Sequence, residues 1–445
     1  MNATPPPAVK KTLLPRTLTQ HLRRPLVCAI AAMTTLTGMA VPLTPGTAHA
    51  EGPYRQTRRC LSEGPSPATV TRGVSWAQQQ LRYSELWPLA TGKGVTVAVI
   101  DTGINPGPAF GKRLVGGGDL IIPGERGLRD CDGHGTLVAG IIGGSVDLET
   151  GFAGVAPEAT ILSIRQASLS YAPLQQTGRQ TAGTTQSLGT AIDLAVAQGA
   201  KVINISEAEC GIAGTVNDPK LTASVQAALA KDVVIVAAAG NLSGGPCQTQ
   251  NTPGKIPVTS ATPAEIPGVI AVGAVDAKGI AAPFSLAGPW VGIAAPGMNI
   301  ISTNPFPGGA HQVDAMLSGN GSQQIQGTSF SAPYVAGVAA LIRERHPQLT
   351  AAQVAERILD SAVGGSNHAV GRGIIDPRGA LTAVRPQEGE NARRPSTAAD
   401  TMPPMPEPAP APPGRAPALW STAAIASLLT VWVISIGVRR RRPTD

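Results

Sequence analysis

The middle of the chain alternates between short apolar runs and longer helical patterns. Runs of strand length, rich in β-branched residues, lie at residues 95–100, 160–164, 202–206, 233–239 and 269–275. Helical patterns lie at residues 187–198, 221–231, 329–345 and 350–359. A run that is apolar throughout is typical of a strand covered on both faces, and alternation with helices supplies that cover. The pattern therefore predicts an α/β fold with a mostly parallel sheet and helices on both faces.

The two ends of the chain carry patterns of another kind. Residues 1–50 combine a basic region, an apolar run and Ala-His-Ala before Glu51, which predicts a secretory signal peptide, with an uncleaved signal anchor as the alternative. Residues 416–438 are uncharged, and as a helix they would span about 34 Å, enough to cross a bilayer. The four arginines that follow would stay in the cytoplasm, which leaves the body of the chain outside.

These patterns divide the chain into six predicted segments. They are a signal peptide (1–50), an amino-terminal extension (51–92), a folded domain (93–384), a Pro/Ala-rich linker (385–415), a transmembrane helix (416–438) and a cytoplasmic tail (439–445). The extension is too short to fold alone, so we expect it to wrap the folded domain and maturation not to depend on its removal. The linker cannot bury a core and should be an extended tether.

The charge of the chain is concentrated at its ends. The 445 residues carry a formal net charge of +7, but residues 1–50 hold five basic residues and no acidic one, and residues 439–445 add a net +3. The part between them is close to neutral, at −1. A body without excess positive charge argues against a nucleic-acid interface, and the basic ends fit membrane targeting instead.

A serine opens the longest helical pattern. Residues 327–333 read Gly-Thr-Ser-Phe-Ser-Ala-Pro and run directly into the mostly apolar residues 334–342. At the start of a buried helix, Ser329 would have an unpaired backbone N–H and the positive end of the helix dipole beside it, which suits a developing oxyanion. An ordinary helix cap is the alternative for the same residues.

A catalytic serine needs a general base and a carboxylate that orients the base. His134 stands out among the histidines because it lies in Asp-Gly-His-Gly-Thr, where a helix begins and glycines allow close backbone approach. Asp101 and Asn241 each follow a predicted parallel strand, at the sheet edge where open α/β folds place their chemistry. The Asn241 amide could donate to an oxyanion from the side opposite the Ser329 N–H.

The order Asp101, His134, Asn241, Ser329 and the surrounding motifs resemble the subtilisin-type serine peptidases over roughly residues 92–383. The resemblance implies a subtilisin-like fold and a serine endopeptidase acting on proteins or peptides without a cofactor. In that reaction Ser329 would attack, His134 would take and return the proton, and Asp101 would orient the imidazole. Activity should fall below about pH 6.5 as His134 becomes protonated.

Further features resemble one group within that superfamily, the mycosins, which are membrane-anchored peptidases associated with type VII secretion. These features are the two membrane-targeting ends, a Trp-Ala-Gln-Gln-Gln-Leu motif at 76–81, Cys131 near the histidine and the serine motif. The resemblance implies a single-pass protein of the cell membrane whose peptidase domain lies outside and processes type VII exported proteins. It leaves open a structural role in the membrane secretion complex, with proteolysis secondary.

Four cysteines remain once the leader is removed, namely Cys60, Cys131, Cys210 and Cys247. An even number in an exported chain predicts two disulfides, for which three pairings are possible. The segments of Cys210 and Cys247 both leave the carboxyl edge of predicted neighbouring strands, which favours that pair. Cys60 would then tie the extension to Cys131, an arrangement of the kind found in mycosins. The alternative for Cys131 is a thiol nucleophile or metal ligand.

The predicted substrate strand departs from the family pattern. Subtilisins have Ser-X-Gly where this chain has Ser206, Glu207 and Ala208, and in the family this backbone pairs with the substrate while the glycine lines the pocket for the residue before the cut. The Ala208 methyl should narrow that pocket and favour small residues, unless the loop absorbs it. Glu207 should deter acidic residues further upstream. The polar segment 165–185 should form a flexible flap beside the cleft.

A metal site is the remaining alternative. Asp130, Asp132 and His134 have a spacing that could gather metal ligands, but a fourth ligand is missing and the histidine already serves the predicted triad. We therefore predict no metal there. Calcium, which many subtilisins bind, stays undecided because no matching acidic loop is evident.

Overall fold

The computed structural model describes residues 53–61, 73–175, 181–216, 218–243, 247–318 and 321–385. They belong to the second of two compact units, residues 51–445, and the first unit is residues 1–50. The predicted signal peptide, transmembrane helix and cytoplasmic tail, and the linker beyond residue 385, lie outside the described residues. Within those ranges, none of the helices combines the length and apolarity needed to cross a membrane.

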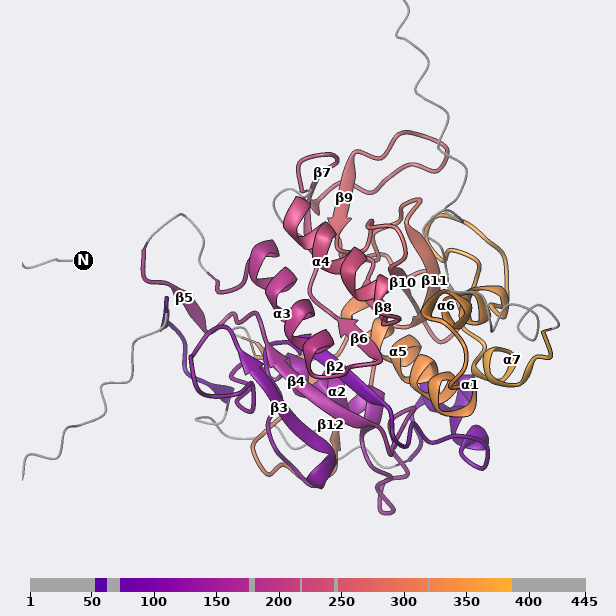
Figure 1. Ribbon diagram of the computed structural model, residues 1–445, viewed down its shortest axis with the longest axis horizontal. Coiled ribbons are helices and arrows are strands. Elements are labelled where there is room, and N and C mark those ends of the chain that lie inside the picture. The colour runs from indigo at the N-terminus through magenta and orange to yellow at the C-terminus, as the bar shows by residue number, and fades with distance from the viewer. Residues whose placement is uncertain are drawn as a thin grey trace, which may run out of the picture. The chain divides into compact units, whose positions relative to one another are not determined.

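A seven-stranded sheet forms the centre of the domain (Figure 1). In spatial order it contains β11 (Val291–Pro296), β10 (Ile270–Val275), β8 (Val234–Ala238), β6 (Val202–Ile205), β2 (Thr96–Asp101), β4 (Thr160–Arg165) and β3 (Leu114–Asp119). All neighbouring strands run parallel, which confirms the predicted sheet. The edge strands β3 and β11 were not anticipated, because glycines and a terminal proline dilute their apolar pattern.

Helices cover both faces of the sheet, as predicted (Figure 1). One hydrophobic cluster joins the sheet to α1 (Trp76–Leu81), α2 (His134–Gly143), α5 (Thr328–Arg345), α6 (Ala351–Asp360) and α7 (Pro377–Thr382). A second cluster joins it to α3 (Thr185–Ala197) and α4 (Pro219–Ala230). In β2, Val97 and Val99 belong to the first cluster and Ala98 and Ile100 to the second, because successive side chains of a strand point to opposite faces.

Side-chain caps set the starts of several helices. Thr184 and Ser187 form a capping box at α3, and Thr350 and Gln353 form another at α6. Asp218 accepts backbone N–H groups at the start of α4. These caps satisfy donors that the first turn leaves free, so α3 and α4 begin two residues before their apolar patterns do.

Short elements surround this core. The antiparallel pairs are β1 (Tyr54–Gln56) with β5 (Tyr171–Pro173), β7 (Glu209–Ile212) with β9 (Thr259–Thr262), β12 (Ser302–Thr303) with β13 (Gln312–Val313), and β14 (Ala315–Ser318) with β15 (Gly321–Gln324). Two 3₁₀ turns, η2 (Tyr83–Leu86) and η3 (Gly111–Arg113), complete the described elements.

The amino-terminal extension is fastened to the domain in two ways. Its strand β1 pairs with β5, and a disulfide joins Cys60 to Cys131. A second disulfide joins Cys210 to Cys247, so the structure has the pairing that the sequence favours. The described part of the extension around β1 and Cys60 is therefore fastened next to the segment that carries the candidate histidine.

The predicted flap, residues 165–185, contains regular structure in its described part. Arg165 is the last residue of β4, is fully buried and lies 2.7 Å from the Asp119 carboxylate. Further along, β5 pairs with the extension. Neither feature has a local sequence signal, because a buried ion pair and a strand paired with a distant segment leave no apolar periodicity.

Candidate active site

The end of β2 and the start of α2 bring a carboxylate and an imidazole together. His134 Nδ1 lies 2.7 Å from Asp101 Oδ1, and Asp101 is fully buried. The same oxygen accepts the backbone N–H of Thr102. The approach depends on Gly135, because a Cβ there would collide with the carbonyl oxygen of Gly103 and lie 3.0 Å from Asp101 Oδ1. The glycines around the histidine therefore allow the contact.

A second buried carboxylate, Asp130, holds the loop that precedes α2. Its oxygens accept the Thr102 hydroxyl, the N–H groups of Asp132 and Gly133, and both the N–H and the hydroxyl of Thr136. Burial raises the pKa of Asp130 to about 6, and the nearby charge of Asp132 adds to this, whereas the Thr136 bonds oppose it. Asp130 thus fixes the helix start from which His134 projects.

Ser329 lies in the first turn of α5, and only 6% of the residue is exposed. The ring of the next residue, Phe330, packs against the imidazole of His134 with the ring centroids 5.0 Å apart. The first turn of α5 and the start of α2 are therefore neighbours. Within the part of the chain that the structure describes, no hydrogen bond joins the Ser329 hydroxyl to the imidazole.

The backbone carbonyl of Ser329 has a side-chain partner. Pro333 lies inside α5, four residues after Ser329, and it lacks the N–H that would normally bond this carbonyl. The Ser206 hydroxyl donates to it instead at 2.8 Å, and Asn204 Nδ2 donates to Ser206 at 2.9 Å. The side chain of Ser206, predicted to belong to the substrate strand, thus holds the turn that carries the serine.

Asn241 follows β8 and faces the same turn. Its Oδ1 accepts the N–H of Thr328 at 2.9 Å and the Thr328 hydroxyl at 3.1 Å, which directs Nδ2 the other way. A Cβ on Gly327 would lie 2.9 Å from Ser329 Oγ and 3.6 Å from Asn241 Nδ2, so the hydroxyl and the amide border one small space. Only glycine, with its φ of +147°, leaves that space open.

Carboxylates surround the imidazole. Burial by itself lowers the pKa of His134, but the charge and hydrogen bond of Asp101, with the charges of Glu207 and Asp130, outweigh it and raise the pKa to about 9. Glu207 Oε1 lies 3.9 Å from His134 Nδ1. Desolvation raises the pKa of Glu207 above that of an ordinary carboxyl, the charges of Asp101 and Asp132 raise it further, and the imidazole opposes them.

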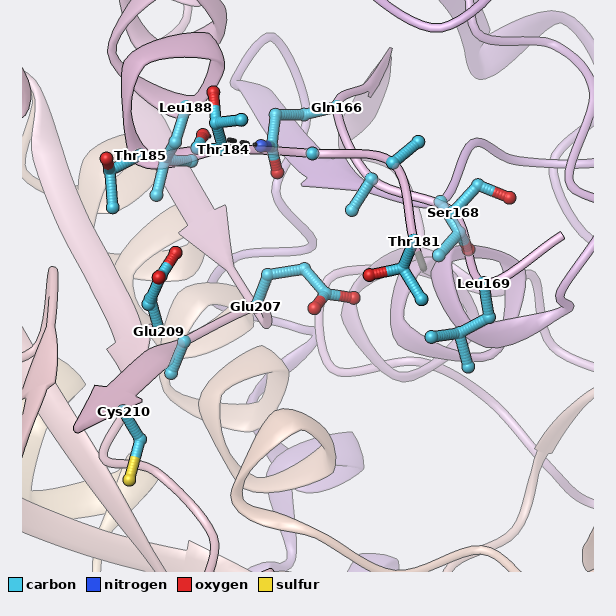
Figure 2. A pocket seen from close by; sticks show the side chains of 15 residues that line it. Gln166, Ser168, Leu169, Thr181, Thr184, Thr185, Leu188, Glu207, Glu209 and Cys210 are labelled. Atoms are coloured by element: carbon cyan, nitrogen blue, oxygen red, sulfur yellow. Dashed lines mark hydrogen bonds between the residues drawn. The ribbon is translucent and has the colours of Figure 1, made fainter. Parts of the chain in front are cut away.

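Glu207 and Ala208 border a cavity of about 330 Å³ (Figure 2). Its other walls include residues 166–169 and 181–185, the two arms of the segment that the sequence placed beside the cleft. Figure 2 shows the Glu207 side chain extending from its loop toward Thr181. Ala208 also packs against a small apolar cluster next to the β7–β9 pair. Because Glu207 also lies beside the imidazole, this cavity adjoins the candidate catalytic groups.

Three of these groups have a spacing that a metal ion could bridge. In the described ranges, ligand atoms of Asp101, His134 and Glu207 lie within 4.8 Å of one another. A metal there would have to displace the hydrogen bond that orients the imidazole. Asp130 and Asp132, considered as metal ligands from the sequence, already have hydrogen-bond partners. The carboxylate of Asp130 accepts groups at the start of α2, and that of Asp132 accepts two serine hydroxyls of the segment 166–171.

A carboxylate, an imidazole, a serine and an amide thus come together from four elements at the carboxyl edge of a parallel sheet. Chain order and fold are those of a serine peptidase of the subtilisin class, and the contact between Asp101 and His134 is consistent with its Asp-His-Ser triad. The sequence profile of the Subtilase family matches residues 92–373.

Comparisons with known proteins narrow the class further. The chain is 38% identical over 427 residues to Mycosin-1 of Mycolicibacterium smegmatis, covering 91% of this chain and 92% of that relative. Its fold resembles the MycP3 protease from the type VII (ESX-3) secretion system, with a TM-score of 0.68 and 41% identity over 74% of this chain and 94% of the other. It also resembles a chain of an intact ESX-5 inner membrane complex, with a TM-score of 0.66 and 32% identity over 87% and 94%. The protein belongs to the subtilase family of serine peptidases and, within it, to the mycosins.

The roles of several residues near the triad were not predicted from the sequence. Asp130 was considered only as a metal ligand, although its place just before a helix start could have marked it as a capping carboxylate. Glu207 was assigned to the substrate strand without its contact to His134, and Phe330 was not considered at all. Neither contact has a sequence signal, because each joins segments far apart in the chain.

Proposed function

We propose that the protein is an extracytoplasmic serine endopeptidase, anchored in the cell membrane by residues 416–438, that processes proteins exported by a type VII secretion system. The observation that carries the proposal is the 2.7 Å contact between His134 and Asp101, next to the turn of Ser329. The similarity to a protease of an ESX-3 system and to a chain of an ESX-5 membrane complex supports the cellular setting.

In the proposed reaction Ser329 attacks the peptide carbonyl, and His134 accepts its proton and returns it to the leaving amine. Asp101 holds the imidazole in the productive tautomer and stabilises the imidazolium. The Asn241 amide, whose Nδ2 borders the same space beside Gly327 as the Ser329 hydroxyl, binds the oxyanion together with the Ser329 N–H. We expect the hydrogen bond between the serine hydroxyl and the imidazole to form in the complex with substrate.

The test compares exported proteins of wild-type cells with those of cells that carry Ser329→Ala, with all amino termini mapped. We expect a set of new termini in the wild type that the variant lacks, because loss of the nucleophile lowers turnover by up to about 10⁶-fold. Ser224→Ala, the same substitution on the outer helix α4, is the matched control and should leave every terminus unchanged. Identical termini in wild type and Ser329→Ala cells, at equal protein levels, would refute the processing role.

A structural role is the second candidate, and the likeness to a chain within an intact ESX-5 inner membrane complex favours it. A structural component would be needed for its fold and would not depend on its nucleophile. Secretion and complex stability should then survive Ser329→Ala but fail in a whole-protein deletion. If the substitution abolishes secretion as fully as the deletion, proteolysis is the main role.

The substrate pocket is also a proposal. The Ala208 methyl, where the family has glycine, narrows the pocket for the residue before the cut and favours Ala, Ser or Gly there. Digestion of a peptide library by the intact protein tests this preference. Frequent cleavage after Phe, Tyr or Trp would show that the loop absorbs the methyl group.

A further inference from the structure

The side chains of the segment between β6 and β7 divide between two sides. Ser206 points under the nucleophile, where it donates to the Ser329 carbonyl at 2.8 Å. Glu207 extends into the cavity that residues 166–169 and 181–185 enclose (Figure 2). Its side chain is 38% exposed, and its carboxylate reaches within 3.9 Å of the imidazole of His134. Glu207 thus belongs both to the cavity wall and to the surroundings of the general base.

The cavity supplies Glu207 with no cation of its own, and the positive charge beside it is that of the His134 imidazole, 3.9 Å away. Its described lining consists of Thr, Ser, Gln, Ala, Gly, Leu, Glu and Cys residues, without a lysine or an arginine. The charges that act on Glu207 are those of Asp101 and Asp132, which repel its ionised form, and that of His134. A cavity of about 330 Å³ is large enough for one long side chain of a bound peptide.

A cationic side chain would suit this cavity on three grounds. It would pair with the carboxylate of Glu207, compensate the repulsion from Asp101 and Asp132, and lay its apolar stem along Leu169 and Leu188 of the wall. An acidic side chain would add a like charge to the same space and be rejected. A neutral side chain of equal length would gain only the contact of its stem.

We propose that Glu207 makes this cavity a subsite for a lysine or arginine side chain of the substrate, at the second or fourth residue before the scissile bond. The inference rests on the proposed peptidase function and names its substrate class. The position follows from alternation, because side chains of an extended peptide point alternately to opposite sides. Ala208 is expected beside the side chain that precedes the cut, so its neighbour Glu207 would meet a side chain of the alternate set, although both residues line the cavity.

The test measures kcat/KM of the intact protein on fluorogenic peptides that differ only at the second or fourth position before the cut. Lysine is compared with norleucine, which has the same stem without the charge, and with glutamine and glutamate. We expect lysine to exceed norleucine by about tenfold at one of these positions and glutamate to fall about tenfold below glutamine. The lysine preference should shrink as salt screens the pair.

The variant Glu207→Gln should abolish the lysine-to-norleucine ratio, whatever it does to the absolute rate. Glu149→Gln is the matched control, because it removes one negative charge from a side chain that is 79% exposed and outside the cavity lining, and it should keep the ratio. A lysine preference confined to the first or third position, or one that survives in Glu207→Gln, would overturn the proposal. If no peptide is cleaved in a Ser329-dependent manner, the peptidase function itself fails instead.

Discussion

The pH dependence of catalysis should change when Glu207 is replaced by glutamine. A general base must be neutral to accept a proton, so kcat/KM falls below the pKa of His134 in the free enzyme. The surrounding carboxylates raise that pKa to about 9. The acid limb of the pH profile, the pH range in which kcat/KM falls as His134 becomes protonated, should therefore lie well above the pH 6.5 of an ordinary imidazole. Removing the Glu207 carboxylate destabilises the imidazolium, so the acid limb must move to lower pH.

The size of the shift follows from the distance between the two groups. At 3.9 Å the attraction between unit charges is about 1 kcal/mol at a dielectric constant of 80 and about 4 kcal/mol at 20. Because the Glu207 side chain is 38% exposed, solvent screening favours the lower end, roughly 1 to 2 kcal/mol. One pKa unit corresponds to 1.36 kcal/mol, so the limb should fall by about one pH unit.

The assay is kcat/KM on an uncharged peptide between pH 5 and pH 10 at constant ionic strength. At neutral pH, Glu207→Gln should be up to about tenfold faster than the wild type, because a larger fraction of His134 is neutral. Asp101→Asn is the contrast, since it should lose about 10⁴-fold through the wrong tautomer. A limb that stays in place or rises in Glu207→Gln would refute the electrostatic reasoning, and Glu149→Gln controls for overall charge.

Three further substitutions test separate parts of the site and the fold. Asn241→Ala should lower kcat by about 10² to 10³-fold with little change in KM, as measured by steady-state kinetics, and an unchanged kcat would remove it from the oxyanion site. Ser206→Ala leaves the Ser329 carbonyl unpaired, so it should lower kcat about tenfold with KM nearly constant. Ser206→Thr keeps a hydroxyl and should restore kcat, and failure of that rescue would point to simple misfolding. Cys60→Ser removes the disulfide to Cys131, which closes a loop of 71 residues and stabilises the folded state by about 4 kcal/mol. The calorimetric Tm should therefore fall by roughly 10 °C, and an unchanged Tm would contradict the stabilising role of the disulfide.

Much of the fold could be predicted because its strands are covered on both faces. A run such as Val97 to Ile100 must be apolar at every position, which a single sequence displays openly. The edge strands β3 and β11 are held by one neighbour each, so glycines are tolerated there and the pattern fades. The starts of α3 and α4 were predicted two residues too late because their caps are polar.

The site could be predicted only as far as its motifs extend. Asp101, His134, Asn241 and Ser329 are marked by the ends of strands and the start of a helix, and local rules locate such positions. The hydrogen bond from Ser206 to the Ser329 carbonyl has no local signal. It requires knowing that a missing N–H in α5 is compensated by a hydroxyl that precedes it by more than a hundred residues. A hydrogen bond between such distant segments depends on tertiary structure, which a local sequence pattern does not show.

The proposed subsite and the raised pKa of His134 are two consequences of one carboxylate, and they should be coupled. When a lysine of the substrate pairs with Glu207, that carboxylate attracts the imidazolium less, so the pKa of His134 should fall in the complex. The acid limb of the kcat profile reports the pKa of His134 in the enzyme–substrate complex, whereas that of the kcat/KM profile reports its pKa in the free enzyme. For a lysine peptide the kcat limb should therefore lie below the kcat/KM limb by up to about one pH unit, and by less for the norleucine peptide. Equal separations for the two peptides would mean that the cation does not reach Glu207 in the productive complex.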